Sequence, residues 1–268
     1  MPAENLFHET KSLLRRYGIR PKKKLGQNFL VSKRLLVKII RSLSLGPSDT
    51  IVEVGAGLGT LTIELAKRAG RVIAVEVDRR LIEVLEDRLR GFSNVEIIEG
   101  DILKMDLPEC DKVTGNIPYY ISSKLLVKLL REPRYTYAVF MLQKEFAERL
   151  IAKPGTANYG RISIIAQIYG EITILDKAGR RAFYPAPKVE SALIKIKPKL
   201  EARRYINHVE RITAILFSQR RRKVGKVLLK AGVDTSTLRD IIDVEKRVYE
   251  LTPQEILLIA ESIYTGGE

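Results

Sequence analysis

The chain has 268 residues, 45% hydrophobic and 29% charged, so it can bury a sizeable core and has room for one large domain and one small one. A single cysteine excludes an intramolecular disulfide, and two histidines far apart in sequence give no ligand spacing, so we expect no metal site. The formal net charge of +15 indicates a polyanionic partner such as nucleic acid, although a heat-adapted surface rich in Lys, Arg and Glu would carry the same excess.

Membrane and export signals are missing from the sequence, and the positive charge is concentrated at its front. No apolar run approaches about 20 residues, and residues 1–10 lack the apolar core of a signal peptide. We therefore expect a cytoplasmic protein without a membrane-spanning segment. We also expect it to be a monomer. Residues 1–41 contain 11 basic and 2 acidic residues, which makes this end of the chain a candidate for contact with a polyanion.

The N-terminal part predicts two helices separated by a basic loop. A weak helical pattern over residues 6–17 is broken by a Gly and a Pro, and a triplet of lysines follows at 22–24. Ser32 then caps a second helix, whose apolar residues between 35 and 43 recur on one face.

From Thr50 onward, short apolar runs alternate with amphipathic stretches, which is typical of a parallel sheet with crossover helices. The clearest helix spans Asp78 to Arg90. The last two strands have few residues between them, so we expect them to pair antiparallel at one edge. Five parallel strands and a terminal hairpin describe the methyltransferase variant of the doubly wound, Rossmann-like α/β fold, with a seven-stranded sheet. The strands are predicted at Ile51–Val54, Val72–Glu76, Val95–Ile98, Lys112–Thr114, Tyr137–Leu142, Glu171–Leu175 and Ser191–Ile196.

After Pro198 the sequence changes to helical patterns interrupted by Gly225, Gly232 and Pro253. We therefore predict a small all-helical C-terminal domain over residues 199–268. The larger domain, residues 1–198, contains the motifs that predict ligand binding and catalysis.

A glycine-rich segment lies between the first strand of the predicted sheet and the next helix. Gly55 and Gly57 let the backbone approach a ligand at the helix N-terminus, and Glu76 ends the next strand, where a carboxylate can accept both hydroxyls of a ribose. NAD sites share these features. Two details favour another nucleoside ligand: Thr60 stands where the NAD fingerprint has Gly or Ala, and Glu53 is placed to help bind an amino-bearing or cationic group. Glycines that serve only a tight turn are the alternative.

Two further motifs fall at strand ends on the same predicted edge of the sheet. Asp101 follows the third strand, where its carboxylate can accept a hydrogen bond from an adenine amino group. Pro118 ends the fourth strand, so the Asn116 side chain and the Ile117 carbonyl are presented at its edge. With the ring of Tyr119 they form a receptor for a flat ring bearing an amino group. Each motif alone is usually only a turn.

Taken in order, these motifs resemble the KsgA family of rRNA adenine N6,N6-dimethyltransferases. The resemblance covers roughly residues 20–198, and it implies S-adenosylmethionine as cofactor and methyl donor. It implies as acceptors two adjacent adenosines near the 3′ end of small-subunit rRNA in a pre-ribosomal particle. Large-subunit rRNA adenine methylases share the same motifs and remain an alternative. The matching positions are Gln27–Leu30, the glycine loop, Glu76, Gly100–Asp101, Asn116–Tyr119 and the Phe-x-Pro-x-Pro-x-Val motif from Phe183 to Val189.

The resemblance also assigns residues to the chemistry. Asn116 and the Ile117 carbonyl would bind the two hydrogens of adenine N6 and favour a pyramidal nitrogen whose lone pair faces the methyl group. Tyr119 and Phe183 would stack on the two faces of an extruded base. The cofactor would contact Asn28, Leu30, Gly55, Gly57, Glu76, Asp101 and Asn116.

RNA contacts are expected at two basic clusters, for which a solvated charged surface is the alternative. Two other functions stay open: a ribosome-assembly factor that chiefly binds RNA, with methylation secondary, and an NAD-linked oxidoreductase, which the residue at position 60 disfavours. The clusters comprise Lys22, Lys23, Lys24, Arg220, Arg221, Arg222 and Lys223.

Overall fold

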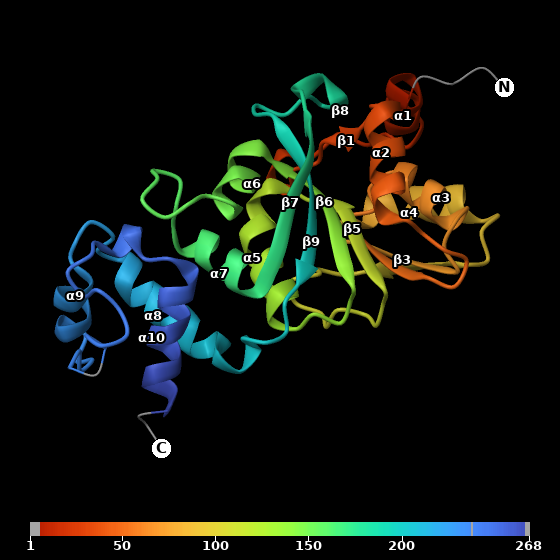
Figure 1. Ribbon diagram of the computed structural model, residues 1–268. Coiled ribbons are helices and arrows are strands. Elements are labelled where there is room, and N and C mark those ends of the chain that lie inside the picture. Colours follow the sequence, from red (N-terminus) through yellow and green to blue (C-terminus); the bar gives the residue numbers. More distant parts are fainter. Residues whose placement is uncertain (1–5, 237, 266–268) are drawn as a thin grey trace. The chain divides into compact units, whose positions relative to one another are not determined.

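One mixed sheet is the framework of the larger part of the protein. Figure 1 shows the computed structural model, which describes residues 6–236 and 238–265. Within these residues, seven strands form a single sheet in the order β4-β3-β2-β5-β6-β9-β7. Each predicted strand lies inside an observed one, which confirms the predicted fold class. The strands are β2 (Thr50–Val54), β3 (Arg71–Glu76), β4 (Val95–Glu99), β5 (Lys112–Asn116), β6 (Tyr137–Gln143), β7 (Gly170–Ala178) and β9 (Ser191–Pro198).

The strand order reverses at β2, which has β3 on one side and β5 on the other. Strands β2 to β6 pair in parallel, whereas β9 pairs antiparallel with β6, with Phe140 opposite Ile194. In a parallel sheet of this kind, the connections leave in opposite directions at the switch point and open a crevice at the carboxyl ends of the strands. The crevice therefore lies where Val54, Glu76 and Asn116 end their strands.

The predicted N-terminal helices form as the apolar periodicity requires. In α2 (Lys33–Leu43) the Ser32 hydroxyl accepts a hydrogen bond from the Leu35 amide at 3.4 Å, which caps the helix. Its buried residues are the five predicted apolar positions, and they share a core cluster with Ile51 and Val72 of the sheet. The predicted helix over residues 78–90 is observed as α4 (Arg79–Leu89), in which Leu81, Leu85 and Leu89, at spacing four, are buried.

The remaining helices complete the chain. The α-helices are α1 (Leu6–Arg16), α3 (Thr60–Ala66), α5 (Ser122–Arg131), α6 (Lys144–Leu150), α7 (Arg161–Tyr169), α8 (Ile206–Phe217), α9 (Val224–Lys230) and α10 (Pro253–Thr265). Short 3₁₀ turns occur at η1 (Lys23–Leu25), η2 (Tyr119–Ile121), η3 (Arg180–Ala182), η4 (Arg203–Tyr205) and η5 (Val248–Glu250). In the part of the chain that is described, no helix is long and apolar enough to cross a membrane.

A two-stranded sheet joins two segments that are distant in sequence. Strands β1 (Phe29–Leu30) and β8 (Phe183–Tyr184) pair antiparallel, with Leu30 opposite Phe183. This pairing fixes the segment after residue 25 beside the motif that begins at Phe183.

The chain divides into two compact units whose boundaries differ in part from the predicted domains. The first unit runs up to Ala147 and includes Thr173–Lys197, and the second contains Glu148–Ile172 and the chain from Pro198 onward. Residues 148–172, expected in the first domain, thus belong to the second unit, because α7 is buried on nearly every side and packs against α8 and α10. The expected outer ends, residues 1 and 268, lie outside the described residues.

Candidate active site

A cavity of about 390 Å³ lies at the carboxyl ends of β2, β3, β4 and β5, within the size range of small-molecule sites. Its walls come from the loops after these strands and from residues 25–29. Six of the seven residues predicted to contact the cofactor line it, the exception being Leu30: Asn28, Gly55, Gly57, Glu76, Asp101 and Asn116.

The glycine loop after β2 adopts a backbone that only glycine accepts easily. Gly57 has φ of 61° and Gly59 has φ of 78°, both in the left-handed region. A Cβ atom on Gly59 would lie 3.0 Å from the Leu85 side chain, so the loop also packs tightly on α4. The turn aims the Gly57 amide at Glu76 Oε2, which accepts its hydrogen bond at 2.9 Å.

Glu76 is a buried carboxylate held in place by backbone donors. It is 6% exposed, and its Oε1 accepts hydrogen bonds from the Val77 and Asp78 amides, each at 2.9 Å. Burial raises the pKa of Glu76 more than these bonds and that of the Gly57 amide lower it. A carboxyl group fixed in this way at a cavity wall fits the hydroxyls of a ribose.

Asn116 is oriented from across the cavity. Its Nδ2 donates to the carbonyl oxygen of Asn28 at 2.5 Å, which leaves the carboxamide oxygen as the atom suited to accept from a ligand. Ile117 follows; the whole residue is only 1% exposed and does not line the cavity, and its amide donates to the Met141 carbonyl at 3.1 Å. The backbone at the end of β5 is therefore held rigidly, as an amino-group receptor requires.

The two predicted stacking aromatics, Tyr119 and Phe183, lie outside the lining of the cavity. Phe183 is 3% exposed and packs in the core cluster that contains Leu30, because the β1–β8 pairing turns both side chains inward. Neither Phe183 nor Leu30 lines the cavity, which is the expected cofactor site, so the stacking of Phe183 on the substrate base and the contact of Leu30 with the cofactor stay predictions. Tyr119 is half-buried, its hydroxyl lies 2.8 Å from Ser191 Oγ, and it also does not line the cavity.

The sequence did not single out Tyr120, which is the exposed aromatic at the cavity. It is 57% exposed and lines the wall together with Asp101. Burial and the nearby carboxylates of Asp101 and Glu76 raise the pKa of its hydroxyl. The only sequence signal was a second Tyr directly after the first. Glu53, by contrast, lies 2% exposed in β2 and outside the cavity, so it is not the ligand-facing carboxylate that its position suggested.

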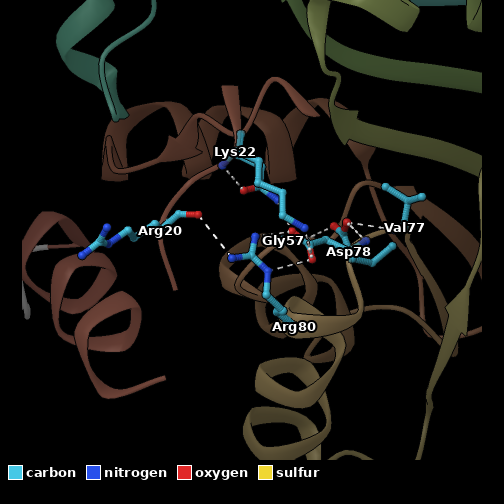
Figure 2. A network of polar contacts seen from close by, with 8 residues as sticks. Arg20, Lys22, Gly57, Val77, Asp78 and Arg80 are labelled. Carbon is cyan, nitrogen blue, oxygen red and sulfur yellow. Dashed lines mark hydrogen bonds and ion pairs between the residues drawn. The ribbon is translucent and has the colours of Figure 1, made fainter. Parts of the chain in front are cut away.

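The two predicted RNA-binding clusters belong to different units. Residues 22–24 adjoin the cavity wall, and all three lysines are exposed. Lys22 Nζ also pairs with Asp78 Oδ1 at 3.3 Å, as Figure 2 shows. In the second unit, Lys223 pairs with Glu245 and the arginines at 221 and 222 are exposed. No group of three or more His, Cys, Asp or Glu side chains in the described ranges could hold a metal ion.

Comparison with known proteins gives a consistent result. Residues 18–265 match the family model described as ribosomal RNA adenine dimethylase. The probable ribosomal RNA small subunit methyltransferase A of Pyrococcus furiosus is 43% identical, covering 95% of this chain and 96% of the relative. The protein of the same name from Methanosarcina mazei is 40% identical, over 95% of this chain and 97% of the relative.

Two solved structures resemble most of the chain. A dimethyladenosine transferase from Plasmodium falciparum matches with a TM-score of 0.80 and 31% identity, over 89% of this chain and 98% of that one. The 23S rRNA methyltransferase ErmE matches with a TM-score of 0.67 and 28% identity, over 87% of this chain and 98% of that one.

Proposed function

Because this chain belongs to the ribosomal RNA adenine dimethylase family and is an rRNA adenine dimethyltransferase, we propose that it methylates N6 of two adjacent adenosines near the 3′ end of small-subunit rRNA. The names of the archaeal relatives, which specify the small subunit, support this acceptor. The substrate is RNA within a pre-ribosomal particle, and the enzyme acts as a cytoplasmic monomer.

The observation that carries the cofactor assignment is the convergence of Gly57, Glu76, Asp101 and Asn116 on one cavity at the switch point of the sheet. Glu76 accepts the ribose hydroxyls and Asp101 the adenine amino group. When bound, S-adenosylmethionine supplies a methyl group on a positively charged sulfur. The buried, rigid carboxyl of Glu76 and the glycine loop fit such a nucleoside, and the cavity is large enough to take it.

Asn116 and Ile117 perform the positioning that the reaction needs. The Asn28 carbonyl holds the Asn116 amide nitrogen, so Oδ1 faces the substrate amino group. With the Ile117 carbonyl as second acceptor, both N6 hydrogens are bound and the nitrogen lone pair turns out of the ring plane toward the methyl group. Neither acceptor is a charged base, so the first methyl group can be accommodated and the nitrogen rotated for the second transfer.

The target base and its backbone need their own contacts. Tyr119 stacks on the extruded adenine next to Asn116. Phosphates are bound by the exposed Lys23 and Lys24 beside the cavity. Arg221 and Arg222 bind phosphates from the second unit.

The test is transfer of labelled methyl groups to small ribosomal subunits that lack the modification, with the modified nucleotides mapped by primer extension. We expect two dimethylated adenosines with the wild-type enzyme. Asn116→Ala should lower the rate at least 100-fold and leave RNA affinity unchanged, because it removes one acceptor but no phosphate contact. Asn207→Ala, at an exposed position of α8, is the matched control. If Asn116→Ala retains full activity, the positioning mechanism is wrong.

Large-subunit rRNA is the second candidate acceptor, since the structural match to ErmE covers most of the chain. Large subunits assayed in parallel decide between the two. Labelling confined to 23S-type rRNA would reverse the assignment. RNA binding without any transfer to either subunit would favour an assembly factor.

A further inference from the structure

Asp78 is a buried carboxylate beside the cavity, and it is not engaged in helix capping. It occupies the N-cap position of α4, where an Asp side chain ordinarily accepts a hydrogen bond from the first turn, yet it makes no such bond. Its side chain is 2% exposed and does not line the cavity. The carboxylate instead accepts bonds from outside its own helix and from one neighbouring arginine.

Three side chains converge on Asp78, as Figure 2 shows for Lys22 and Arg80. Arg80 donates from Nε to Oδ1 at 3.1 Å and from Nη2 to Oδ2 at 2.7 Å. Gln27 Nε2 donates to Oδ2 at 2.7 Å, and Lys22 Nζ lies 3.3 Å from Oδ1. Two of the three partners therefore come from the N-terminal segment, more than 50 positions away in sequence.

That segment forms one wall of the cavity, from Leu25 to Phe29. Before β1 it has only the short turn η1 as regular structure, so side-chain hydrogen bonds add to the β1–β8 pairing in holding it in place. The Gln27 side chain does so twice, because its Oε1 also accepts the Lys22 amide at 2.6 Å. Arg80 adds a third link through its Nη1, which donates to the Arg20 carbonyl at 3.4 Å.

Asp78 is also linked to the carboxylate that we assign to the ribose. Its own amide donates to Glu76 Oε1 at 2.9 Å. Asp78 thus orients Glu76 through its backbone amide and the 25–29 wall of the cavity through its side chain.

We propose that Asp78 is a positioning residue. Its carboxylate and the hydrogen bond from Gln27, together called the latch, hold residues 25–29 over the bound cofactor. The latch thereby couples cofactor binding to the order of the lysine segment at 22–24. The inference rests on the proposed cofactor site. The latch stays charged at all working pH values, because Arg80, and after it Gln27 and Lys22, hold the pKa of Asp78 far below its usual range. Coupling is reciprocal, so bound cofactor must also stabilise the latched segment.

The test measures cofactor affinity by isothermal titration calorimetry with S-adenosylmethionine, using full-length wild type, Asp78→Asn, Gln27→Ala and the double variant. Each single variant should weaken binding about tenfold. The double variant should bind S-adenosylmethionine no more weakly than the single variant with the lower affinity, since both changes break the same link.

Asp87→Asn is the matched control. Asp87 also lies on α4 and also accepts a hydrogen bond from the N-terminal part of the chain, from the Tyr17 hydroxyl, and it pairs with Arg16 at 3.7 Å. It does not line the cavity, and its variant should bind S-adenosylmethionine within twofold of wild type. Urea unfolding of all variants checks that each is folded.

Trypsin gives a second readout, independent of activity, because it cuts after the lysines at 22–24. Without cofactor, Asp78→Asn should be cut there about tenfold faster than wild type, and cofactor should protect wild type but not the variant. If wild type binds S-adenosylmethionine and either single variant binds as tightly, the latch is refuted. Additive losses in the double variant would also refute it. If wild type does not bind S-adenosylmethionine at all, the proposed cofactor site fails instead.

Discussion

Glu53 gives the sharpest prediction about pH, through the variant Glu53→Gln. Glu53 lies in β2 between Ala74 of β3 and Thr114 of β5, and it is 2% exposed. Its Oε2 makes no hydrogen bond, and neither does the Thr62 hydroxyl. The Thr62 hydroxyl lowers the pKa of Glu53, but by less than burial raises it. Burial, with a smaller contribution from the charge of Glu76, raises the pKa of Glu53 to about 8.

The raised pKa of Glu53 makes the folded state lose stability as pH rises. Below the ordinary value of 4.5 the carboxyl is protonated in both states and adds no pH-dependent term to the free energy of unfolding. Between 4.5 and about 8 the folded state keeps a proton that the unfolded state has lost, so the free energy of unfolding falls by about 1.4 kcal/mol per pH unit. The full loss above pH 8 is on the order of 5 kcal/mol. Gln cannot ionise, so Glu53→Gln should remove this slope.

The assay is urea unfolding of both proteins at pH 5, 6, 7 and 8. In the difference in unfolding free energy between variant and wild type, the contributions of the other titrating groups cancel. This difference should grow in favour of Glu53→Gln by about 1.4 kcal/mol per pH unit.

Glu64→Gln serves as the control for Glu53→Gln. Partial burial raises the pKa of Glu64, but the hydrogen bonds and charges of Lys67 and Arg68 together lower it by more. The pKa of Glu64 therefore lies below its ordinary value. The stability it contributes is lost only as pH falls below about 4.5, and its difference should be flat from pH 5 to 8. A flat difference for Glu53→Gln as well would refute the reasoning.

Two other predictions concern the strand that presents the substrate receptor and the basic segment beside the cavity. Gly115→Ala should destabilise the protein by about 1–3 kcal/mol, because the new Cβ would lie 2.4 Å from the Val54 carbonyl oxygen. Gly179→Ala, with nothing within 4 Å of its Cβ, should leave urea unfolding nearly unchanged; equal effects would contradict this packing argument. Replacing Lys23 and Lys24 together by Glu should weaken RNA binding and reduce the slope of log affinity against log salt by about one to two, as measured by filter binding from low to high salt. An unchanged slope would mean that these lysines contact no phosphate.

Much of the fold follows from local sequence alone. The apolar runs that became β2, β3, β5 and β6 are buried on both faces, and such runs have few alternatives to a central parallel strand. The helix after Ser32 was equally determined, because its cap and its apolar stripe are both properties of consecutive residues. The carboxyl ends of parallel strands necessarily meet at one edge, so Glu76 and Asn116 could be placed together before any coordinates were known.

Tertiary structure decided what consecutive residues do not encode. The Phe183 ring turns into the core because β8 pairs with β1, a contact between segments more than 150 positions apart. Residues 148–172 join the second unit because α7 needs partners on nearly every side, and α8 and α10 supply them. The sequence by itself therefore determined which elements form and which edge of the sheet carries the chemistry, since these depend on local periodicity. Only the folded chain decided which side chains face the cavity and that Gln27 meets Asp78, because both depend on packing between distant segments.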